Sequence, residues 1–330
     1  MSSAMRECAR VSRSFHAGSY VASLYIGQRL GRAAALVLRA LAGEVAAASR
    51  QSTPGLASLR LSFWRRAAEA ALENRIETPT NGIALGDGSQ APAIIALRAL
   101  SGELRLGESA VARRRLLTLV DNAPRCCGRG ELVDESGGDN TAVGGPREAG
   151  HMYVQRMNEL EAMAEAVDSN ILYLTNTALR ETADVHEFEH AASHVGKAVG
   201  IVRMIQNTPL LASERRSILP TELCAKFGLV MEDVYRGNSS EALRDTIHAV
   251  ASVAHGHLAQ ARDMSHTRGE LISQASKRVL LPGLASQQYL DMLEKREFDI
   301  FHPDVQNIDT GLSQLQLQMQ IAYNAFVGRY

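Results

Sequence analysis

A His-Glu-x-x-His pattern is the clearest candidate for chemistry in the sequence. It spans residues 186–190, and His186, His190 and His194 would lie one turn apart on a helix. Histidines at this spacing share a helix face, so they can hold one Zn²⁺ while the glutamate acts as a base on a metal-bound water. The surrounding charged residues favour the alternative, which is a solvated helix face without a metal.

Other pairs of reactive residues have weaker patterns. His255 and His257 would point to different faces of a helix, which makes them a poor chelate. Ser265 and His266 follow no strand-to-helix turn of the kind that positions a hydrolase nucleophile. The four cysteines include no C-x-x-C pair, so free thiols are expected. The residues therefore predict no cofactor.

The elements that would position these residues are helices. Apolar residues recur at helical spacing from 30 to 41 and from 195 to 205, whereas strand-like alternation is scarce. Pro92 predicts a helix that begins at Ala93, and Pro209 predicts the end of the helix at 194–206. The predicted fold class is all-α. Further helices are expected at 220–227, 240–263, 286–297 and 310–326.

Composition separates flexible from folded segments. Residues 1–19 contain Arg6, Arg10 and Arg13 with a single acid, which is typical of a mitochondrial transit segment, and this N-terminus is expected to be flexible. The glycine-rich stretch at about 124–150 is expected to be a flexible insertion. We expect residues 20–330 to form one helical domain around that insertion. The sequence has no apolar run long enough to span a membrane, and its net charge of −1 gives no general attraction to nucleic acid.

The segment 195–220 carries a family resemblance. It reads VGKAVGIVRMIQNTPLLASERRSILP. It resembles the part of squalene and phytoene synthases in which a glycine-containing helix precedes an Asp-x-x-x-Asp motif, a basic run and Leu-Pro. The resemblance implies the isoprenoid synthase fold, with helices around a central cavity. In active members, this motif and a second acidic motif on an early helix bind magnesium, which holds the substrate diphosphate.

Both acidic motifs are degenerate in this chain. Counted from the Leu-Pro pair, the later carboxylate positions fall on neutral residues, and the early motif retains one acid. The degenerate positions are Glu44, Ala46, Ala47, Arg50, Asn207 and Leu211. The basic run survives as Arg215 and Arg216, which we expect to contact a phosphate or a partner. The resemblance therefore implies no catalytic residues and no magnesium.

The resemblance is closer still to a noncatalytic mitochondrial branch of this family, which assists the assembly of respiratory complex I. Three segments carry it in the right order: HAASHVGKAVGIVR at 190–203, SILPTELCAKFGLVMEDVYRG at 217–237 and FDIFHP at 298–303. It implies an assembly factor with complex I subunits as partners. It also implies a location in the mitochondrial matrix, with possible peripheral contact to the inner membrane.

Two alternatives stay open at this point. The same noncatalytic fold could serve assembly of the mitochondrial ribosome, with ribosomal proteins or rRNA as partners. It could also be a prenyl-diphosphate-binding or lipid-binding protein, or an atypical prenyl transferase, that uses the cavity of the family.

Overall fold

The computed structural model describes residues 3–50, 54–73, 91–104, 106–127, 154–180, 185–268, 271–308 and 310–330. All regular secondary structure in these ranges is helical, which confirms the all-α prediction. Within them, no helix is long and apolar enough to cross a bilayer. The elements are α1 (Ser3–Phe15), α2 (Ala17–Leu24), α3 (Arg29–Arg50), α4 (Pro54–Leu72), α5 (Pro92–Leu104), η2 (Leu106–Glu108), α6 (Ala110–Asn122), η3 (Arg125–Cys127), α7 (Met157–Ala164), η4 (Glu165–Ser169), α8 (Asn170–Leu179), α9 (Val185–Ser213), α10 (Thr221–Phe227), α11 (Met231–Tyr235), α12 (Glu241–Arg268), α13 (Gln274–Val279), α14 (Pro282–Lys295), α15 (Pro303–Gln306) and α16 (Gly311–Val327).

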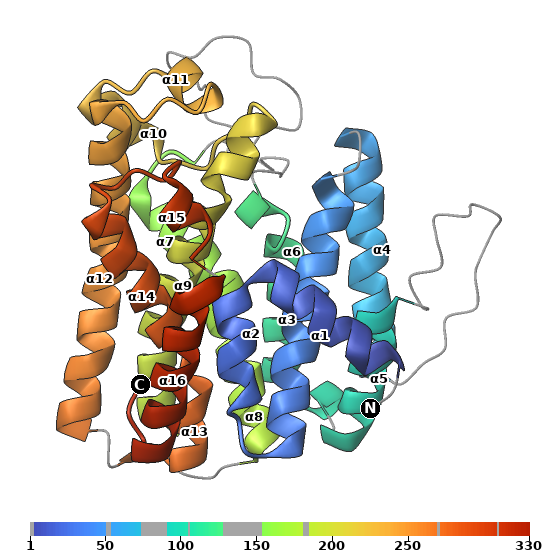
Figure 1. The fold of residues 1–330 in the computed structure, drawn as a ribbon. Helices are drawn as coiled ribbons and strands as arrows, with labels where there is room; N and C mark the ends of the chain where they lie inside the picture. Colours follow the sequence, from blue (N-terminus) through green and yellow to red (C-terminus); the bar gives the residue numbers. More distant parts are fainter. Residues whose placement is uncertain are drawn as a thin grey trace.

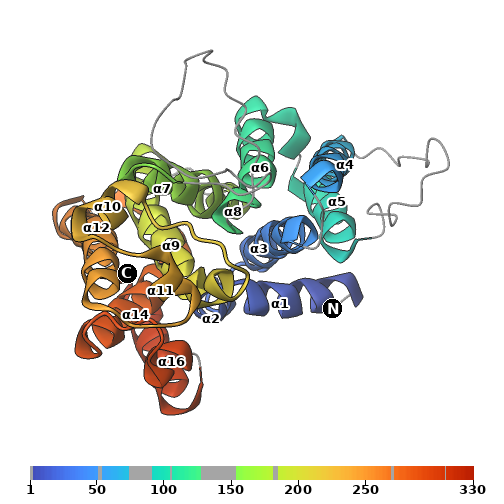
Figure 2. The same ribbon diagram turned by 90° about the horizontal axis from the view of Figure 1, so that it is seen from above.

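Two long helices organise the packing (Figures 1 and 2). α9 packs against α12, α7, α14 and η4, and α3 packs against α1, α8 and α5. α8 joins the two groups, because it contacts both α3 and α9. Apolar side chains from both groups, such as Leu38 of α3 and Val202 of α9, belong to the same main core. The site described below lies where α1, α3 and α9 come together.

The N-terminal residues fold as part of this body, which corrects the prediction of a flexible N-terminus at 1–19. α1 crosses α3 and α5 (Figure 1), and the side chain of Cys8 is fully buried there. Met5, Val11 and Phe15 also pack against the main core. These residues recur at helical spacing, so α1 is amphipathic, and its arginines lie between the apolar positions. A role of this segment in mitochondrial targeting stays a prediction.

The helix boundaries differ from the sequence prediction mainly in α9. The prediction that this helix ends near Pro209 is wrong, because α9 runs from Val185 to Ser213 with Pro209 inside it. Proline removes one backbone hydrogen bond from a helix. The last turn forms nevertheless, because it buries Leu211 and Ala212, and tertiary packing supplies most helical stability in proteins. α5 begins at Pro92, close to the predicted start. Of the predicted insertion at 124–150, residues 128–150 lie outside the described ranges.

Candidate functional site

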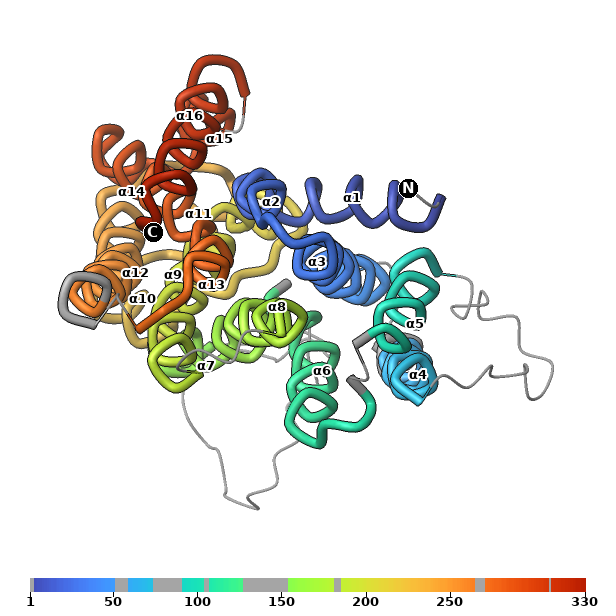
Figure 3. The backbone as a smooth tube through the Cα atoms, turned by 90° about the horizontal axis from the view of Figure 1, so that it is seen from below, coloured from blue at the N-terminus to red at the C-terminus, as the bar shows by residue number. Residues whose placement is uncertain are grey.

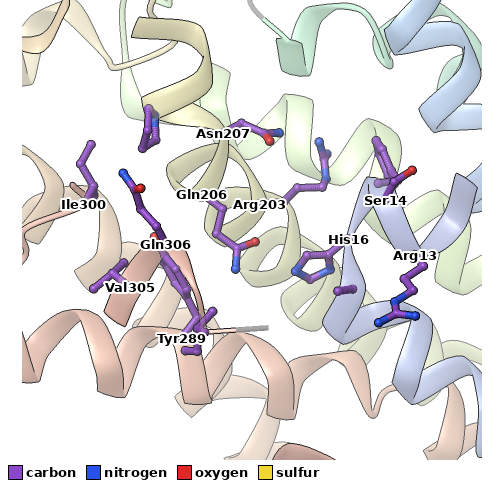
Figure 4. A pocket seen from close by; sticks show the side chains of 14 residues that line it. Arg13, Ser14, His16, Arg203, Gln206, Asn207, Tyr289, Ile300, Val305 and Gln306 are labelled. Carbon is purple, nitrogen blue, oxygen red and sulfur yellow. The ribbon is translucent and has the colours of Figure 1, made fainter. Parts of the chain in front are cut away.

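Two neighbouring pockets open beside α1 and α9. The first, called here the α9 pocket, has a volume of about 200 Å³ and lies between α1, α9, α14 and the segment around α15 (Figure 4). The second, called here the α3 pocket, has a volume of about 330 Å³ and lies between α1, α3 and α9. Ser14, Phe15 and Asn207 line both pockets, so the two share a wall.

The structure brings most of the degenerate motif positions together. Glu44, Ala46, Ala47 and Arg50 of α3 line the α3 pocket, and Asn207 of α9 lines it as well. The four early positions and one of the two late positions therefore line one pocket. At the positions that the sequence analysis assigned to the missing carboxylates, this pocket presents the methyl groups of Ala46 and Ala47, the guanidinium of Arg50 and the amide of Asn207.

The remaining predicted positions lie elsewhere. Leu211 is 1% exposed and belongs to the main apolar core, so it lines neither pocket. Arg215 pairs with Glu232 at 2.9 Å, and Arg216 is buried and pairs with Glu214. Neither arginine lines the α9 or the α3 pocket. Their contact with a phosphate or a partner stays a prediction.

Two carboxyl groups line the α3 pocket, and neither is arranged as a magnesium ligand. Glu7 accepts a hydrogen bond from Arg10 Nε at 2.9 Å, so its carboxyl group is already paired with a guanidinium. Burial raises the pKa of Glu44 to about 7, against the opposing effect of a hydrogen bond from the Ala93 backbone. Magnesium takes oxygen ligands in a near-octahedral set and is usually held through one or two ionised carboxylates together with water or phosphate oxygens. These residues therefore do not fit the ion that the acidic motifs of the family bind.

A buried ion pair lies beside the α9 pocket. Arg203 Nη2 donates to Asp168 Oδ2 at 2.7 Å, and the two side chains are 1% and 8% exposed. The Arg203 guanidinium also stacks on the ring of Phe15, 4.6 Å from the ring centre. A second buried arginine, Arg39, donates to Ser23 Oγ at 2.8 Å. The centre of the fold therefore holds two guanidinium groups and one carboxylate.

Asp168 reaches this position because it lies on η4, a single π-helical turn between α7 and α8. π-turns inside helices often occur at functional sites. α9 approaches η4 closely at two glycines. A Cβ atom on Gly196 would lie 2.2 Å from Ser169 Oγ, and one on Gly200 would lie 2.5 Å from Ala164 Cβ. The absence of a side chain at both glycines therefore allows α9 to pack closely against the end of α7 and against η4.

His16 lies at the rim of the α9 pocket, where α1 gives way to α2 (Figure 4). Burial, and then the positive charges of Arg203 and Arg39, lowers its pKa to about 3. Its Nδ1 lies 2.5 Å from Ser19 Oγ. His16 is therefore a neutral imidazole at physiological pH. Sequence reasoning missed His16, Arg203 and Asp168. The available signal was Arg203, a single charged residue within an apolar helical stretch.

The predicted zinc residues are divided between two environments. His186 and His190 are exposed on the first turns of α9, whereas Glu187 between them is buried. His194 is half-buried, and its ring centre lies 5.2 Å from that of His190. Within the part of the chain that the structure describes, no group of three or more His, Cys, Asp or Glu side chains is arranged to hold a metal ion.

His194 instead belongs to a chain of polar side chains that joins three helices. Its Nδ1 lies 3.0 Å from Nδ1 of His257 in α12, and Nε2 of His257 lies 2.7 Å from Glu161 Oε1 in α7. Burial, and then the neighbouring His257 and His190, lowers the pKa of His194 to about 4. This series of interacting side chains was not expected from the sequence, because His257 was considered only together with His255. The side chains of Ser265 and His266 lie outside the described residues.

Comparison with solved structures identifies the fold. The structure superposes on a dehydrosqualene synthase with a TM-score of 0.70 over 98% of this chain and 97% of that one, at 11% identity. A squalene synthase from Alicyclobacillus acidocaldarius gives a TM-score of 0.62 over 90% of this chain and 95% of that one, at 14% identity. These likenesses confirm the isoprenoid synthase fold.

Comparison of sequences identifies the family. The profile of the squalene/phytoene synthase family matches residues 9–314, and the chain therefore belongs to this family. The chain is also similar to "NADH dehydrogenase (ubiquinone) complex I, assembly factor 6" of Rattus norvegicus, at 39% identity over 164 residues. That match covers 50% of this chain and 47% of the rat protein, so it spans about half the length of that relative.

More distant relatives match over more of the chain. The homologue of the same assembly factor in Dictyostelium discoideum is 27% identical over 86% of this chain and 68% of its own length. The Drosophila melanogaster homologue is 26% identical over 92% of this chain and 80% of its own length. The resemblance therefore extends well beyond the segment that the mammalian relatives share.

Proposed function

We propose that the protein is a noncatalytic mitochondrial assembly factor that binds intermediates of respiratory complex I. The observation that carries this proposal is the composition of the α3 pocket. The positions at which synthases of the family hold magnesium carry Ala46, Ala47, Arg50 and Asn207 here. A diphosphate leaving group needs cations that stabilise the charge it develops. A cavity without that metal set supports a role in binding rather than in prenyl transfer.

The client is proposed from the relatives, whose printed names describe assembly factors of complex I. We also propose a location in the mitochondrial matrix with peripheral contact to the inner membrane, where an assembly factor of a respiratory complex would meet its client. The mitochondrial ribosome is the competing client, and it enters as an outcome of the experiment rather than as a second proposal.

The first experiment tests the absence of catalysis. The purified full chain is incubated with farnesyl or geranylgeranyl diphosphate and magnesium, beside a squalene synthase as the positive control. We expect no release of diphosphate and no condensed product. Turnover that disappears in Glu44→Gln would overturn the noncatalytic proposal, because Glu44 is the acid that remains at the early motif.

The second experiment tests the client. Cells that lack the protein are complemented with the tagged wild type or with Glu44→Gln, and complex I is measured on native gels. We expect both forms to restore assembled complex I and to co-purify with its subunits. Co-purification of ribosomal proteins, with complex I assembled normally in the absence of the protein, would reassign the client to the mitochondrial ribosome. Retention of a lipid in native mass spectrometry, with no protein client, would favour a lipid-binding role instead.

A further inference from the structure

α16 presents an outward apolar stripe. Its members are Leu312, Leu315, Met319, Tyr323 and Phe326, and each of these side chains is between 53% and 88% exposed. Figures 2 and 3 place α16 at the edge of the molecule. Large apolar side chains gathered along one exposed helix face mark an interaction surface.

The opposite face of α16 fixes the direction of this stripe. Leu317, Ile321 and Ala325 are buried against α2 and α14, where they form a small apolar core. Gln288 Nε2 of α14 donates to the Ser313 carbonyl at 2.9 Å, which secures the N-terminal end of the helix. α16 is therefore bound to the body along its length, and the stripe faces outward as a fixed surface.

The spacing of the stripe is symmetric about Met319. The intervals between successive members are three, four, four and three residues. Steps of three and four residues keep all five side chains on one face of the helix. Because the order is the same in both directions, an antiparallel second α16 would place Met319 opposite Met319. It would also place Leu315 opposite Tyr323, and Leu312 opposite Phe326.

The charges around α16 favour this antiparallel arrangement. The helix itself contains no Asp, Glu, Lys or Arg, so two copies would not repel along the seam. Two basic residues lie at its C-terminal end, where Arg278 Nε donates to the Ala325 carbonyl at 3.3 Å and Arg329 follows the helix in the sequence. An antiparallel pair separates the two basic ends by roughly the length of the helix, about 25 Å. A parallel pair would bring them together.

The available area is sufficient for an interface. An aromatic side chain offers roughly 150–250 Å², and aliphatic side chains such as leucine and methionine lie toward the lower end of that range. The exposed parts of the five stripe residues and of Val327 beside them therefore amount to on the order of 700 Å² per copy. Each partner in a standard-size interface buries roughly 800 Å².

We propose that the protein forms a homodimer in which α16 of each copy packs antiparallel against α16 of the other. A twofold axis passes close to Met319. This interface lies apart from the α3 and α9 pockets, so it leaves both of them unchanged in each copy.

The oligomeric state of the full chain tests this proposal. Sedimentation equilibrium at micromolar concentrations is expected to give twice the chain mass of 35.7 kDa. Met319→Glu is expected to be monomeric, because it would bury two like charges at the axis. Gln320→Glu adds the same charge next to the stripe and is expected to remain dimeric. A monomeric wild type, or a Met319→Glu variant that stays dimeric, would overturn the proposal.

Crosslinking tests the antiparallel arrangement with cysteine variants, which add no charge to the stripe. Met319→Cys is expected to form a disulfide dimer on mild oxidation, whereas Leu312→Cys alone is not. A mixture of Leu312→Cys and Phe326→Cys chains is expected to form the mixed disulfide. Crosslinking of Leu312→Cys to itself would replace the antiparallel arrangement with a parallel one. A monomer that sediments with anionic vesicles, and loses this in Met319→Glu, would assign the stripe to a lipid surface and overturn the dimer.

Discussion

Arg203 Nη2 donates to Asp168 Oδ2 at 2.7 Å in the centre of the fold, with both side chains almost completely buried. The pair connects α9 to the π-turn η4, and it lies beside the α9 pocket. Removing one member of a buried pair leaves the other charge without compensation, which is more costly than replacing both.

Asp168→Asn and Arg203→Met are therefore each expected to lower the free energy of unfolding by about 3–5 kcal/mol. The double variant is expected to lose less than the sum of the two. Urea denaturation of the four proteins in a double-mutant cycle measures the coupling. Strictly additive losses would show that the pair contributes little beyond packing.

Gly200 allows α9 to approach η4. A Cβ atom there would lie 2.5 Å from Ala164 Cβ and 2.8 Å from Asp168 Oδ2, so Gly200→Ala is expected to lower the free energy of unfolding by about 3 kcal/mol. Gly256 of α12 is the matched control, because a Cβ atom there meets nothing within 4 Å. Gly256→Ala is expected to raise stability by about 0.5–1 kcal/mol, through the higher helix propensity of alanine. Thermal unfolding of both variants compares them directly, and equal effects would count against the close approach.

Stability is expected to depend on pH through the buried His16 and the half-buried His194. Burial is the largest cause that lowers the pKa of His16 to about 3 and that of His194 to about 4. The usual pKa of histidine is about 6.5. Below this pH, the two histidines bind protons in the unfolded chain but not in the folded chain. These histidines therefore reduce the free energy of unfolding as the pH falls from about 6.5 toward 4. Urea midpoints across this range should change less in His194→Gln than in the wild type, with the exposed His255→Gln as the control. Parallel pH profiles for the three proteins would contradict the assignment.

Glu44 has the opposite pH dependence. Burial raises its pKa to about 7, so the folded state holds a proton that the unfolded state releases above about pH 4.5. This contribution to stability is present at low pH and is lost as the pH rises toward 7. Glu44→Gln is expected to raise the free energy of unfolding at pH 8 by about 1 kcal/mol, a value reduced for solvent screening because the group is only partly buried. At pH 4.5 the gain should vanish, and a gain of the same size at both pH values would exclude ionisation as its cause.

Cysteine reactivity is expected to be low in the folded protein. Burial raises the pKa of Cys8 to about 12 and that of Cys224 to about 11, and Cys126 is also buried. The thiolate is the reactive form. Iodoacetamide at pH 8 should therefore modify these three positions only after urea is added, as measured by peptide mass spectrometry. Rapid modification of Cys8 in the native protein would show that α1 detaches from α3.

The fold class was predictable because it depends on local periodicity and on a resemblance spread over the chain. α1 was not predicted because the segment was judged by its composition, which is rich in arginine and serine. Its apolar residues Met5, Cys8 and Phe15 nevertheless recur at helical spacing. The end of α9 was misplaced because a rule for isolated helices was applied to Pro209. Tertiary burial of Leu211 and Ala212 prevails over that rule in the folded chain.

The site was predictable only in part. Counting from Leu-Pro located Asn207, which lines both pockets, but it also selected Leu211, which is a core residue. The pairing of Arg203 with Asp168 depends on a π-turn, which leaves no simple periodic signal in the sequence. The approach of His257 to His194 depends on how α12 packs against α9, and residue spacing alone does not encode this packing.

The contact of α2 with α14 and α16 determines when the fold can be completed. Val21 and Ala22 share their apolar core with Leu284 and Ile321, so residues from near both ends of the sequence meet in one cluster. During synthesis at roughly 5–20 residues per second, α2 emerges tens of seconds before α16 exists. Throughout that interval its apolar side chains lack their native partners. The native packing of α2 against α14 and α16 can therefore form only after α16 has been made.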